Sequence, residues 1–521
     1  MDSNLGISPK VKHKKEILLW FIYALITGFL LYFHEAGRDE WQGIGIARNL
    51  FSLQDFLTRM RAEGHPFLSF IIFKYLLLLH NSINTIKVFN WVIMLIAAWI
   101  LLFKIQIDHY LKIVFLFGYF MLYEYAAIVR AYGMMSMLIL LCVYQLQKKE
   151  RCNYFILLLG MAGMIFNHIY GIMISAGILF YIYYPFFHDY KKLFSHSREN
   201  LLLIGTLLCM SISIYCVWPQ HQDYFYPDHR SGLLKLITHF PKAIGMVWNA
   251  MFNIPAPIID FRNVNLIDYL VSNAVSIHKA TIISNIIKSI LMIPMGYFLF
   301  LMAKENKRAV LTLIFTWLLI MIFQIEVFWG LLRHNGFFYL SFFGFLCLLE
   351  STIKNNLKIF VVCMMSTQLV SSILAICMEM KYDYCGATPA AKYINNLSNG
   401  PFLIECNSRI DINTLQENLK KETVIYVNGK ILNSKFIPWE QLNPNETHEQ
   451  EAHLGWQLRC QRDIAFNPDY RNFTKILVLN FDPRQTGEKE TLDSLINNGN
   501  EFIAFDHTIN AENFYVLKMK D

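Results

Sequence analysis

The chain of 521 residues is 55% hydrophobic and only 16% charged. Soluble proteins carry about a quarter charged residues, so this composition excludes a protein that is water-soluble throughout. Residues 381–521 hold 15 Lys and Arg against 19 Asp and Glu, and subtraction from the totals of 46 and 39 leaves 31 basic and 20 acidic residues before them. The net charge of +7 therefore belongs to the apolar part, where basic residues mark cytoplasmic loops. No basic stripe follows a soluble helix, which argues against a nucleic-acid partner.

The amino-terminal end carries a basic cluster followed by an apolar run. Four lysines, at positions 10, 12, 14 and 15, precede the run Ile17–Phe33. This run is longer than the apolar part of a signal peptide, and no small-residue cleavage site follows it. We expect Ile17–Phe33 to remain as a first membrane span with its amino end in the cytoplasm.

Apolar runs recur along residues 1–380, each long enough to cross or nearly cross about 30 Å of hydrocarbon. They lie near residues 17–33, 66–80, 86–103, 111–128, 131–147, 153–167, 170–187, 200–218, 284–303, 309–328, 335–352 and 357–379. This pattern predicts a polytopic α-helical membrane domain over residues 1–380, with about 11–13 transmembrane or re-entrant helices. Two long connections interrupt it, at 34–65 and 219–283.

Basic clusters set the expected topology, because they are held at the cytoplasmic face. Four of these clusters alternate along the chain in the way that cytoplasmic loops should. They are Lys148–Arg151, Lys191–Arg198, Lys304–Arg308 and Lys354–Lys358. The alternation puts both long connections, the turn Glu326–His334 and the carboxy-terminal region on the outer face. It also requires that one early segment does not cross. His65–Leu79 would be only about 22 Å long as a helix, and we expect it to be re-entrant or interfacial.

Residues 381–521 predict a separate soluble α/β domain. Helix-like segments alternate there with apolar, β-prone segments such as Phe402–Cys406 and Lys475–Phe481, which is typical of a small sheet with covering helices. No glycine-rich phosphate loop follows any of these strands, so we expect the domain to support or recognise rather than to catalyse. The domain also contains three cysteines whose spacing does not reveal a disulfide pairing, Cys385, Cys406 and Cys460.

The connection 34–65 gathers charged residues at a membrane boundary, where charges are costly unless they are solvated or used. From Asp39 onward, apolar positions that include Trp41 and Ala47 roughly follow one helical face, which predicts an interfacial amphipathic helix. Asp39 and Glu40 begin this helix, where the helix dipole favours carboxylates. The pattern alone leaves two interpretations open, a helix cap in a solvated loop and a catalytic acidic pair.

Several short motifs occur in an order that resembles a known superfamily. They are Asp39-Glu40 directly after the first span, Trp41…Ala47-Arg48, Glu63-Gly64-His65-Pro66, the stretch Tyr123–Tyr132 with its Arg130, and Asn167-His168-Ile169-Tyr170-Gly171. Their order and spacing resemble the GT-C glycosyltransferases, and within them the protein mannosyltransferase and aminoarabinose transferase branch, family 39. The motifs cover residues 17–187, and only the general layout agrees over 188–380. Phe67 stands where the family often has a second proline, a departure that bears on the substrate.

The resemblance implies an enzyme that moves a sugar from a polyprenyl-phosphate donor to a lipid, glycan or protein acceptor at the outer face. Asp39 would be the general base for the acceptor hydroxyl, with Glu40 orienting it or replacing it. The departing lipid phosphate needs a countercharge, which arginine supplies well. The candidates for this role are Arg130, Arg333 and His334. Arg333 has a plainer interpretation, since a boundary arginine often only extends its charge to the interface.

Other polar residues at the same boundary are expected near the substrate, namely Glu63, His65, His168 and Glu326. Each histidine has an alternative role as a hydrogen-bonded structural group. No pattern requires a cofactor, although Asp39, Glu40 and His65 offer oxygen and imidazole ligands for a divalent ion such as Mg²⁺ or Mn²⁺. The connection 219–283 would close over the donor or admit the acceptor, or else serve as a solvated connector.

Two other classes of function remain as alternatives. A transporter or flippase for a lipid-linked substrate would place charges near mid-bilayer in two related halves, whereas these charges gather at the outer boundary. A non-catalytic membrane scaffold would rely on the soluble domain. The expected partners are the lipid bilayer, a polyprenyl-phosphate sugar and its acceptor. Short loops and a compact α/β domain fit a bacterial inner membrane, with that domain in the periplasm.

Overall fold

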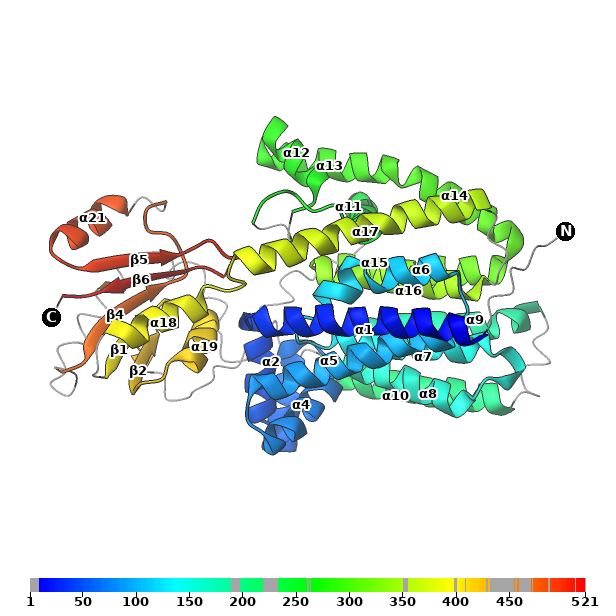
Figure 1. Cartoon of the computed structure of the whole chain (residues 1–521), viewed down its shortest axis with the longest axis horizontal. Coiled ribbons are helices and arrows are strands. Elements are labelled where there is room, and N and C mark those ends of the chain that lie inside the picture. Colours follow the sequence, from blue (N-terminus) through cyan, green and yellow to red (C-terminus); the bar gives the residue numbers. More distant parts are fainter. Residues whose placement is uncertain are drawn as a thin grey trace.

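The computed structural model consists of a helical bundle with an α/β domain at one end (Figure 1). The amino-terminal end of the first helix, which begins at Pro9, lies at the opposite end of the bundle from this domain. The structure describes residues 9–188, 197–218, 233–259, 262, 264–349, 355–397, 401–407, 409–427, 430–431, 454, 457–458, 470, 472–485, 488–510 and 512–520.

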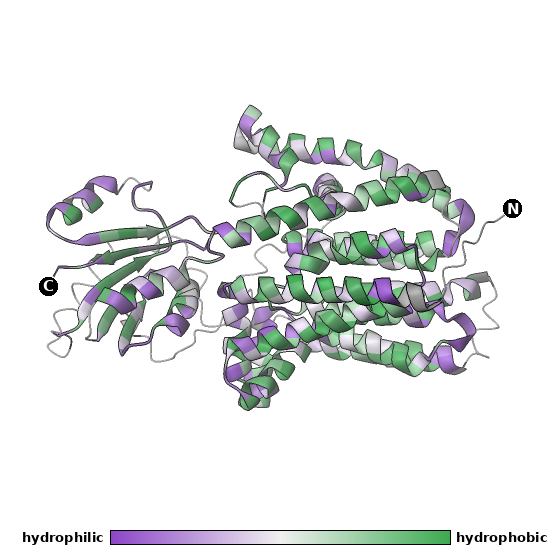
Figure 2. Cartoon of the chain, viewed as in Figure 1, coloured by the Kyte–Doolittle hydropathy of each residue, from purple (hydrophilic) through white to green (hydrophobic). Residues whose placement is uncertain are grey.

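Seven helices or helix pairs among the described residues are long and apolar enough to cross a membrane. They are formed by α1 (Pro9–Phe33), α5 with η1 (Ile83–Trp99, Ile100–Lys104), α9 with η4 (Tyr170–Tyr183, Tyr184–His188), α10 (Ser197–Val217), α13 with α14 (Ile277–Leu291, Ile293–Glu305), α15 (Lys307–Glu326) and α17 (Asn355–Lys381). Hydrophobic residues run along these helices, whereas hydrophilic ones gather in the α/β domain and at the ends of the bundle (Figure 2). The predicted class, a polytopic helical membrane protein with a soluble α/β domain, is confirmed.

Shorter apolar helices complete the bundle. They are α4 (Leu68–Leu79), α7 (Tyr132–Gln147), α8 (Tyr154–Asn167) and α16 (Leu332–Leu348). The 12 residues of α4 span about 18 Å at 1.5 Å per residue, less than the hydrocarbon thickness. The expectation that this segment does not cross stays a prediction.

The predicted run 111–128 is interrupted rather than continuous. It forms the short helix α6 (His109–Leu116) and then the π-helix η2 (Phe120–Glu124). Every residue of η2 is buried, so the irregular backbone is covered by protein, as it must be at membrane depth. The break lets Glu124 accept a hydrogen bond from Tyr119 at 2.7 Å, a contact that no hydropathy pattern predicts.

The α/β domain is built on a six-stranded mixed sheet with the order β3-β2-β1-β4-β6-β5. The strands are β1 (Phe402–Cys406), β2 (Thr423–Val427), β3 (Lys430–Ile431), β4 (Thr474–Leu479), β5 (Glu501–Phe505) and β6 (Phe514–Lys518), and the helices are α18 (Ala387–Leu397), α19 (Arg409–Asn418) and α21 (Lys489–Asn497). The central strand β1 pairs in parallel with both β2 and β4, and all its residues are buried. Cys385 and Cys406 are buried here, while Cys460 lies outside the described residues.

The domain packs directly on the first outer connection. That connection forms α2 (Arg38–Arg48) and α3 (Leu53–Glu63), and α2 lies against α4 on one side and α19 on the other. Residues 40–47 are all buried, so α2 is a covered helix and not the interfacial helix with a solvated polar face that its pattern predicted. The backbone amide of Arg38 donates to Glu512 at 2.8 Å. A Cβ on Gly37 would stand 2.9 Å from the ring of Tyr384, which explains the glycine before α2.

A second connection between bundle and domain runs through Arg262. This residue follows α11 (Leu233–Met251) and precedes α12 (Leu266–Ala274), in the described part of the long connection 219–283. Its guanidinium donates to Glu124 at 2.6 Å, to Asn510 at 2.8 Å, and to the hydroxyl of Tyr384. The side chains of Arg262 and Glu124 are only 6% and 1% exposed. Arg262 therefore joins the long connection to the π-helix by an ion pair and to the α/β domain by hydrogen bonds.

Candidate active site

The predicted site residues converge on one cavity of about 320 Å³ beside the α/β domain. Its lining comes from five segments far apart in the sequence. They contribute Arg38 and Asp39, then Glu63, Gly64 and His65, then Arg130, then His168, Ile169 and Tyr170, and finally Phe323, Phe328, Trp329, Leu331, Arg333 and His334. Of the predicted site residues, Glu40 and Glu326 do not line it.

Asp39 lies at the start of α2 and is held by arginines. Arg333 donates to its carboxylate, Arg130 donates to its backbone carbonyl at 2.5 Å, and Arg38 lies 3.9 Å from the carboxylate. Burial raises the pKa of Asp39, but Arg333 and Arg130 outweigh that effect and hold the pKa well below its usual range. The Asp39 side chain keeps 21% of its surface exposed, so a substrate in the cavity reaches an ionised carboxylate.

Glu63 and His65 enter the cavity because α3 ends in a tight turn. Gly64 caps the helix with φ of 66°, a left-handed conformation that glycine adopts without strain. Glu63 then approaches Arg130 at 3.5 Å, and His65 donates from Nδ1 to the Glu63 carbonyl at 2.9 Å. Burial first, and then the charge of Arg130, lower the pKa of His65 to about 4, so its ring is neutral at physiological pH.

His168 is positioned by the residue before it. Asn167 accepts from Ser69 of α4 at 2.5 Å and donates to the carbonyl of Ala131 at 2.7 Å. Its neighbour His168 accepts at Nδ1 from the backbone amide of Tyr170 at 3.3 Å. The other ring nitrogen of His168, Nε2, is buried and has no hydrogen-bond partner among the described residues. The motif 167–171 thus forms the turn between α8 and α9 that directs one imidazole into the cavity.

The start of α16 brings Arg333 and His334 to the same place. Tyr125 donates to the carbonyl of Arg333 at 2.7 Å, which anchors the first turn to the stretch that also carries Arg130. His334 accepts at Nδ1 from the Leu331 amide at 3.0 Å and contacts the Tyr132 hydroxyl through Nε2 at 3.1 Å. Arg333 keeps its Nε buried and without a hydrogen-bond partner in the described part of the chain.

Glu40 belongs to a different hydrogen-bond network. The expectation that it lies beside Asp39 at the substrate is therefore corrected. Its carboxylate accepts from the amides of Gly37 at 2.9 Å and Val129 at 2.8 Å, and it contacts His34 at 3.1 Å. His34 in turn contacts Glu379 of α17 at 2.8 Å. Successive residues of a helix point about 100° apart, so two adjacent carboxylates at the start of α2 face different surroundings. Glu40 ties α2 to the bundle, so Asp39 is the only member of the acidic pair that lines the cavity.

This network makes stability depend on pH through His34. Burial lowers the pKa of His34, but Glu40 and Glu379 outweigh it and raise the pKa from 6.5 to about 9. The stabilisation is therefore complete below pH 6.5 and is lost as pH rises through 9, and it amounts to about 3 kcal/mol at about 1.4 kcal/mol per pKa unit. We expect the thermal midpoint of the wild type to fall between pH 6 and pH 9.5 by more than that of His34→Gln.

The matched control is His507→Gln, because His507 is 82% exposed on the α/β domain. This variant should keep the wild-type pH dependence over the same range. An equal pH dependence in wild type and His34→Gln, measured in the same detergent or nanodisc, would show that the His34 network does not titrate in this window.

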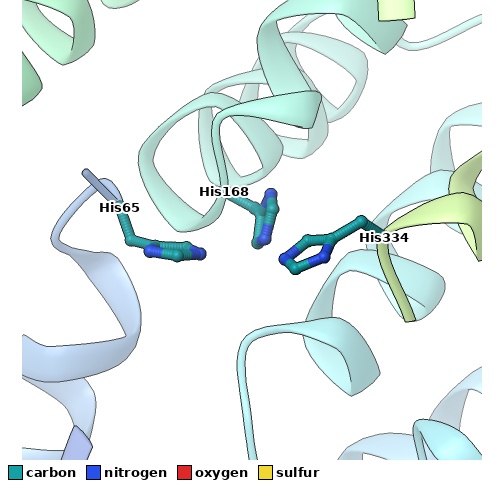
Figure 3. Close-up of side chains that lie close together, drawn as sticks. All are labelled: His65, His168 and His334. Atoms are coloured by element: carbon teal, nitrogen blue, oxygen red, sulfur yellow. The ribbon is translucent and has the colours of Figure 1, made fainter. Parts of the chain in front are cut away.

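Three histidines of the cavity come within reach of one another (Figure 3). One ring nitrogen from each lies within 4.8 Å of the other two, in the set His65, His168 and His334. His65 has the tautomer of a metal ligand, since its Nδ1 carries the proton and its Nε2 keeps a free electron pair. The other two accept a backbone N–H at Nδ1, so their neutral rings carry the proton on Nε2. The cluster therefore offers N–H donors more than metal ligands.

The divalent-metal set expected from the sequence is not assembled either. Glu40 is turned away from His65 and is used by the His34 network, and the carboxylate of Asp39 is used by Arg333. Glu326 lies at the end of α15, and both its carboxylate oxygens are buried without a hydrogen-bond partner among the described residues. Residues 219–232, part of the expected outer loop, lie outside the described residues.

Sequence reasoning missed several residues that build this site. Arg38 lines the cavity next to Asp39, and its position directly before the acidic pair was the available signal. Trp329 also lines the cavity, and the Nζ atom of Lys242 of α11 lies 3.8 Å from the centre of its ring. His34 and Arg262 act through contacts with residues hundreds of positions away, for which a single sequence offers no signal.

Comparison with known proteins agrees with this architecture. No protein-family model and no curated protein sequence matches the chain. By structure it is similar to ArnT from Cupriavidus metallidurans, solved bound to undecaprenyl phosphate, with a TM-score of 0.50 at 10% sequence identity, over 96% of this chain and 97% of that one. The chain therefore shares the fold of ArnT, in agreement with the aminoarabinose transferase likeness that the order of its short motifs suggested.

Proposed function

We propose that the protein is a GT-C type glycosyltransferase that uses a polyprenyl-phosphate-linked sugar. The observation that carries this proposal is the meeting of one carboxylate, Asp39, with two arginines, Arg130 and Arg333, in a cavity beside the domain. A carboxylate and a guanidinium pair are the groups that this transfer needs, one to take a proton and the other to hold a phosphate. The likeness to ArnT, solved with undecaprenyl phosphate, supports the same class of donor.

The proposed reaction is a direct substitution at the anomeric carbon. The oxygen of the acceptor hydroxyl attacks this carbon, the bond to the phosphate oxygen breaks, and the acceptor proton passes to the Asp39 carboxylate. Polyprenyl phosphate leaves with one more negative charge than the donor carried. Arg333 and Arg130 lie where they would hold that charge, and fixed donors of this kind stabilise charge that develops in the transition state. His168 would supply a further N–H donor at Nε2, and Glu63 would keep Arg130 in place.

We place this chemistry at the outer face of a bacterial inner membrane. The cavity is lined in part by the start of α2, which packs on α19 of the α/β domain. The amino-terminal end of α1 lies at the far end of the bundle (Figure 1). With the amino end in the cytoplasm, the cavity and the domain would face the periplasm. Lipid, glycan and protein acceptors all remain compatible with this placement.

The test uses the full-length protein in nanodiscs with a panel of synthetic polyprenyl-phosphate sugars and an envelope lipid extract as acceptor. Mass spectrometry should detect sugar-free polyprenyl phosphate and a glycosylated acceptor in equal amounts for at least one donor. Reconstitution in vesicles separates the alternatives. Intact donor that appears in the opposite leaflet without sugar release would support a flippase, and unchanged donor in both assays would leave the scaffold role.

A further inference from the structure

Two buried hydrogen-bond donors point to an anion in the cavity. Arg333 Nε and His168 Nε2 are buried, and neither has a hydrogen-bond partner among the described residues. A buried donor without a partner costs about 1–3 kcal/mol, so such groups commonly mark a site that a ligand satisfies. Both residues line the same cavity, and both present an N–H. An oxygen-rich ligand, and not a cation, satisfies this pair.

The tautomer of His168 supports this interpretation. Its Nδ1 accepts from the Tyr170 amide at 3.3 Å, so the neutral ring carries its proton on Nε2. Burial, and then neighbouring charges that include His65, lower the pKa of His168 well below its usual value. The ring therefore remains a neutral donor and adds no positive charge.

The charge of the lining also favours an anion. Three arginines and two carboxylates line the cavity, in the set Arg38, Arg130, Arg333, Asp39 and Glu63. With neutral histidines, one positive charge is left over, which a phosphate would balance. Arg333 already uses one nitrogen on Asp39, and its N–H at Nε has no acceptor within the described part of the protein. A phosphate bound there would compete with Asp39 for one guanidinium.

We propose that His168 and Arg333 form an anion site for a phosphate group, and that a phosphate bound there draws Arg333 away from Asp39 and so releases the carboxylate to act as a base. The proposal rests on the proposed function for the role of the released carboxylate, but phosphate binding itself does not require turnover. In the ligand-free state the arginines stabilise the ionised carboxylate and make it a weak base. The Asp39 carboxylate would therefore become a stronger base only when the donor is bound.

The experiment measures the reactivity of Asp39 in the full-length protein in nanodiscs. A water-soluble carbodiimide modifies protonated carboxyl groups, and peptide mass spectrometry at pH 6 reads the labelling at Asp39. Saturating short-chain polyprenyl monophosphate should increase this labelling about tenfold for each unit by which the pKa of Asp39 rises. The corresponding polyprenol, which lacks the phosphate, should leave it unchanged. Asp55, which caps α3 away from the cavity lining, serves as the internal reference.

Two variants separate the anion site from general damage. In Arg333→Met, Asp39 should be labelled rapidly without ligand, and the lipid phosphate should not increase this labelling further. His168→Phe keeps an aromatic ring but loses the N–H, and should weaken lipid-phosphate binding about tenfold or more without raising the unliganded labelling. An equal rise with inorganic phosphate alone would support the anion site and assign it to the free ion. Binding of the lipid phosphate with unchanged Asp39 labelling would overturn the release of the base, whereas no binding at all would overturn the proposed function with it.

Discussion

Replacement of Asp39 by asparagine is expected to reduce sugar transfer by about 10²–10⁴-fold, because a positioned general base contributes a factor of that size. Asparagine keeps the shape of the side chain and still accepts from Arg333, but it cannot take a proton. The variant should bind polyprenyl monophosphate at least as tightly as the wild type, since Arg333 is less strongly held. The measurement pairs the rate of polyprenyl phosphate release with binding of the monophosphate in nanodiscs.

The matched control is Asp55→Asn. Asp55 belongs to the capping box of α3 with Ser52 and does not line the cavity, so its replacement should change the transfer rate less than twofold. Its stability cost should be about 0.3–1 kcal/mol, the contribution of a negative charge in the first turn of a helix. Wild-type transfer by Asp39→Asn would contradict the assignment of the base, and unchanged lipid flipping in both variants would favour transport.

Replacement of Arg262 by methionine is expected to destabilise the protein by about 3–5 kcal/mol, because it leaves Glu124 charged and buried without its partner. The side chains of this pair are 6% and 1% exposed, so water cannot replace the lost contact. The same change removes the hydrogen bonds to Tyr384 and Asn510, and the α/β domain should then be released from the bundle. Chemical denaturation and limited proteolysis between α17 and α18 would measure both effects.

Two further variants test whether the unpaired charge is responsible. The double variant Arg262→Met with Glu124→Leu should recover much of the lost stability, since apolar replacement of a whole buried pair is often nearly neutral. Arg484→Met removes an ion pair with Asp482 in which the arginine is 43% exposed, and should cost less than about 1 kcal/mol. A cost for Arg262→Met as small as that for Arg484→Met would show that the buried pair does not join domain and bundle.

The sequence alone was sufficient for features that depend on local pattern. Long apolar runs determine membrane helices because backbone polar groups must be satisfied internally in lipid. Short apolar, β-prone segments likewise predicted β1 and β4 close to where they lie. The short motifs around Asp39, Arg130 and His168 were enough to predict the fold, and all three residues line one cavity.

Tertiary structure alone decided which of these residues work together. Asp39 and Glu40 are adjacent in sequence, yet one faces the cavity and the other binds His34 and Val129, since helix geometry separates neighbours and only packing chooses the exposed face. Part of the burial of α2 comes from α19, more than 350 positions later, and Arg262 meets Glu124 across 138 positions. Hydropathy reports the environment that a segment prefers, whereas an ion pair or a hydrogen bond depends on distances that exist only after the chain has folded.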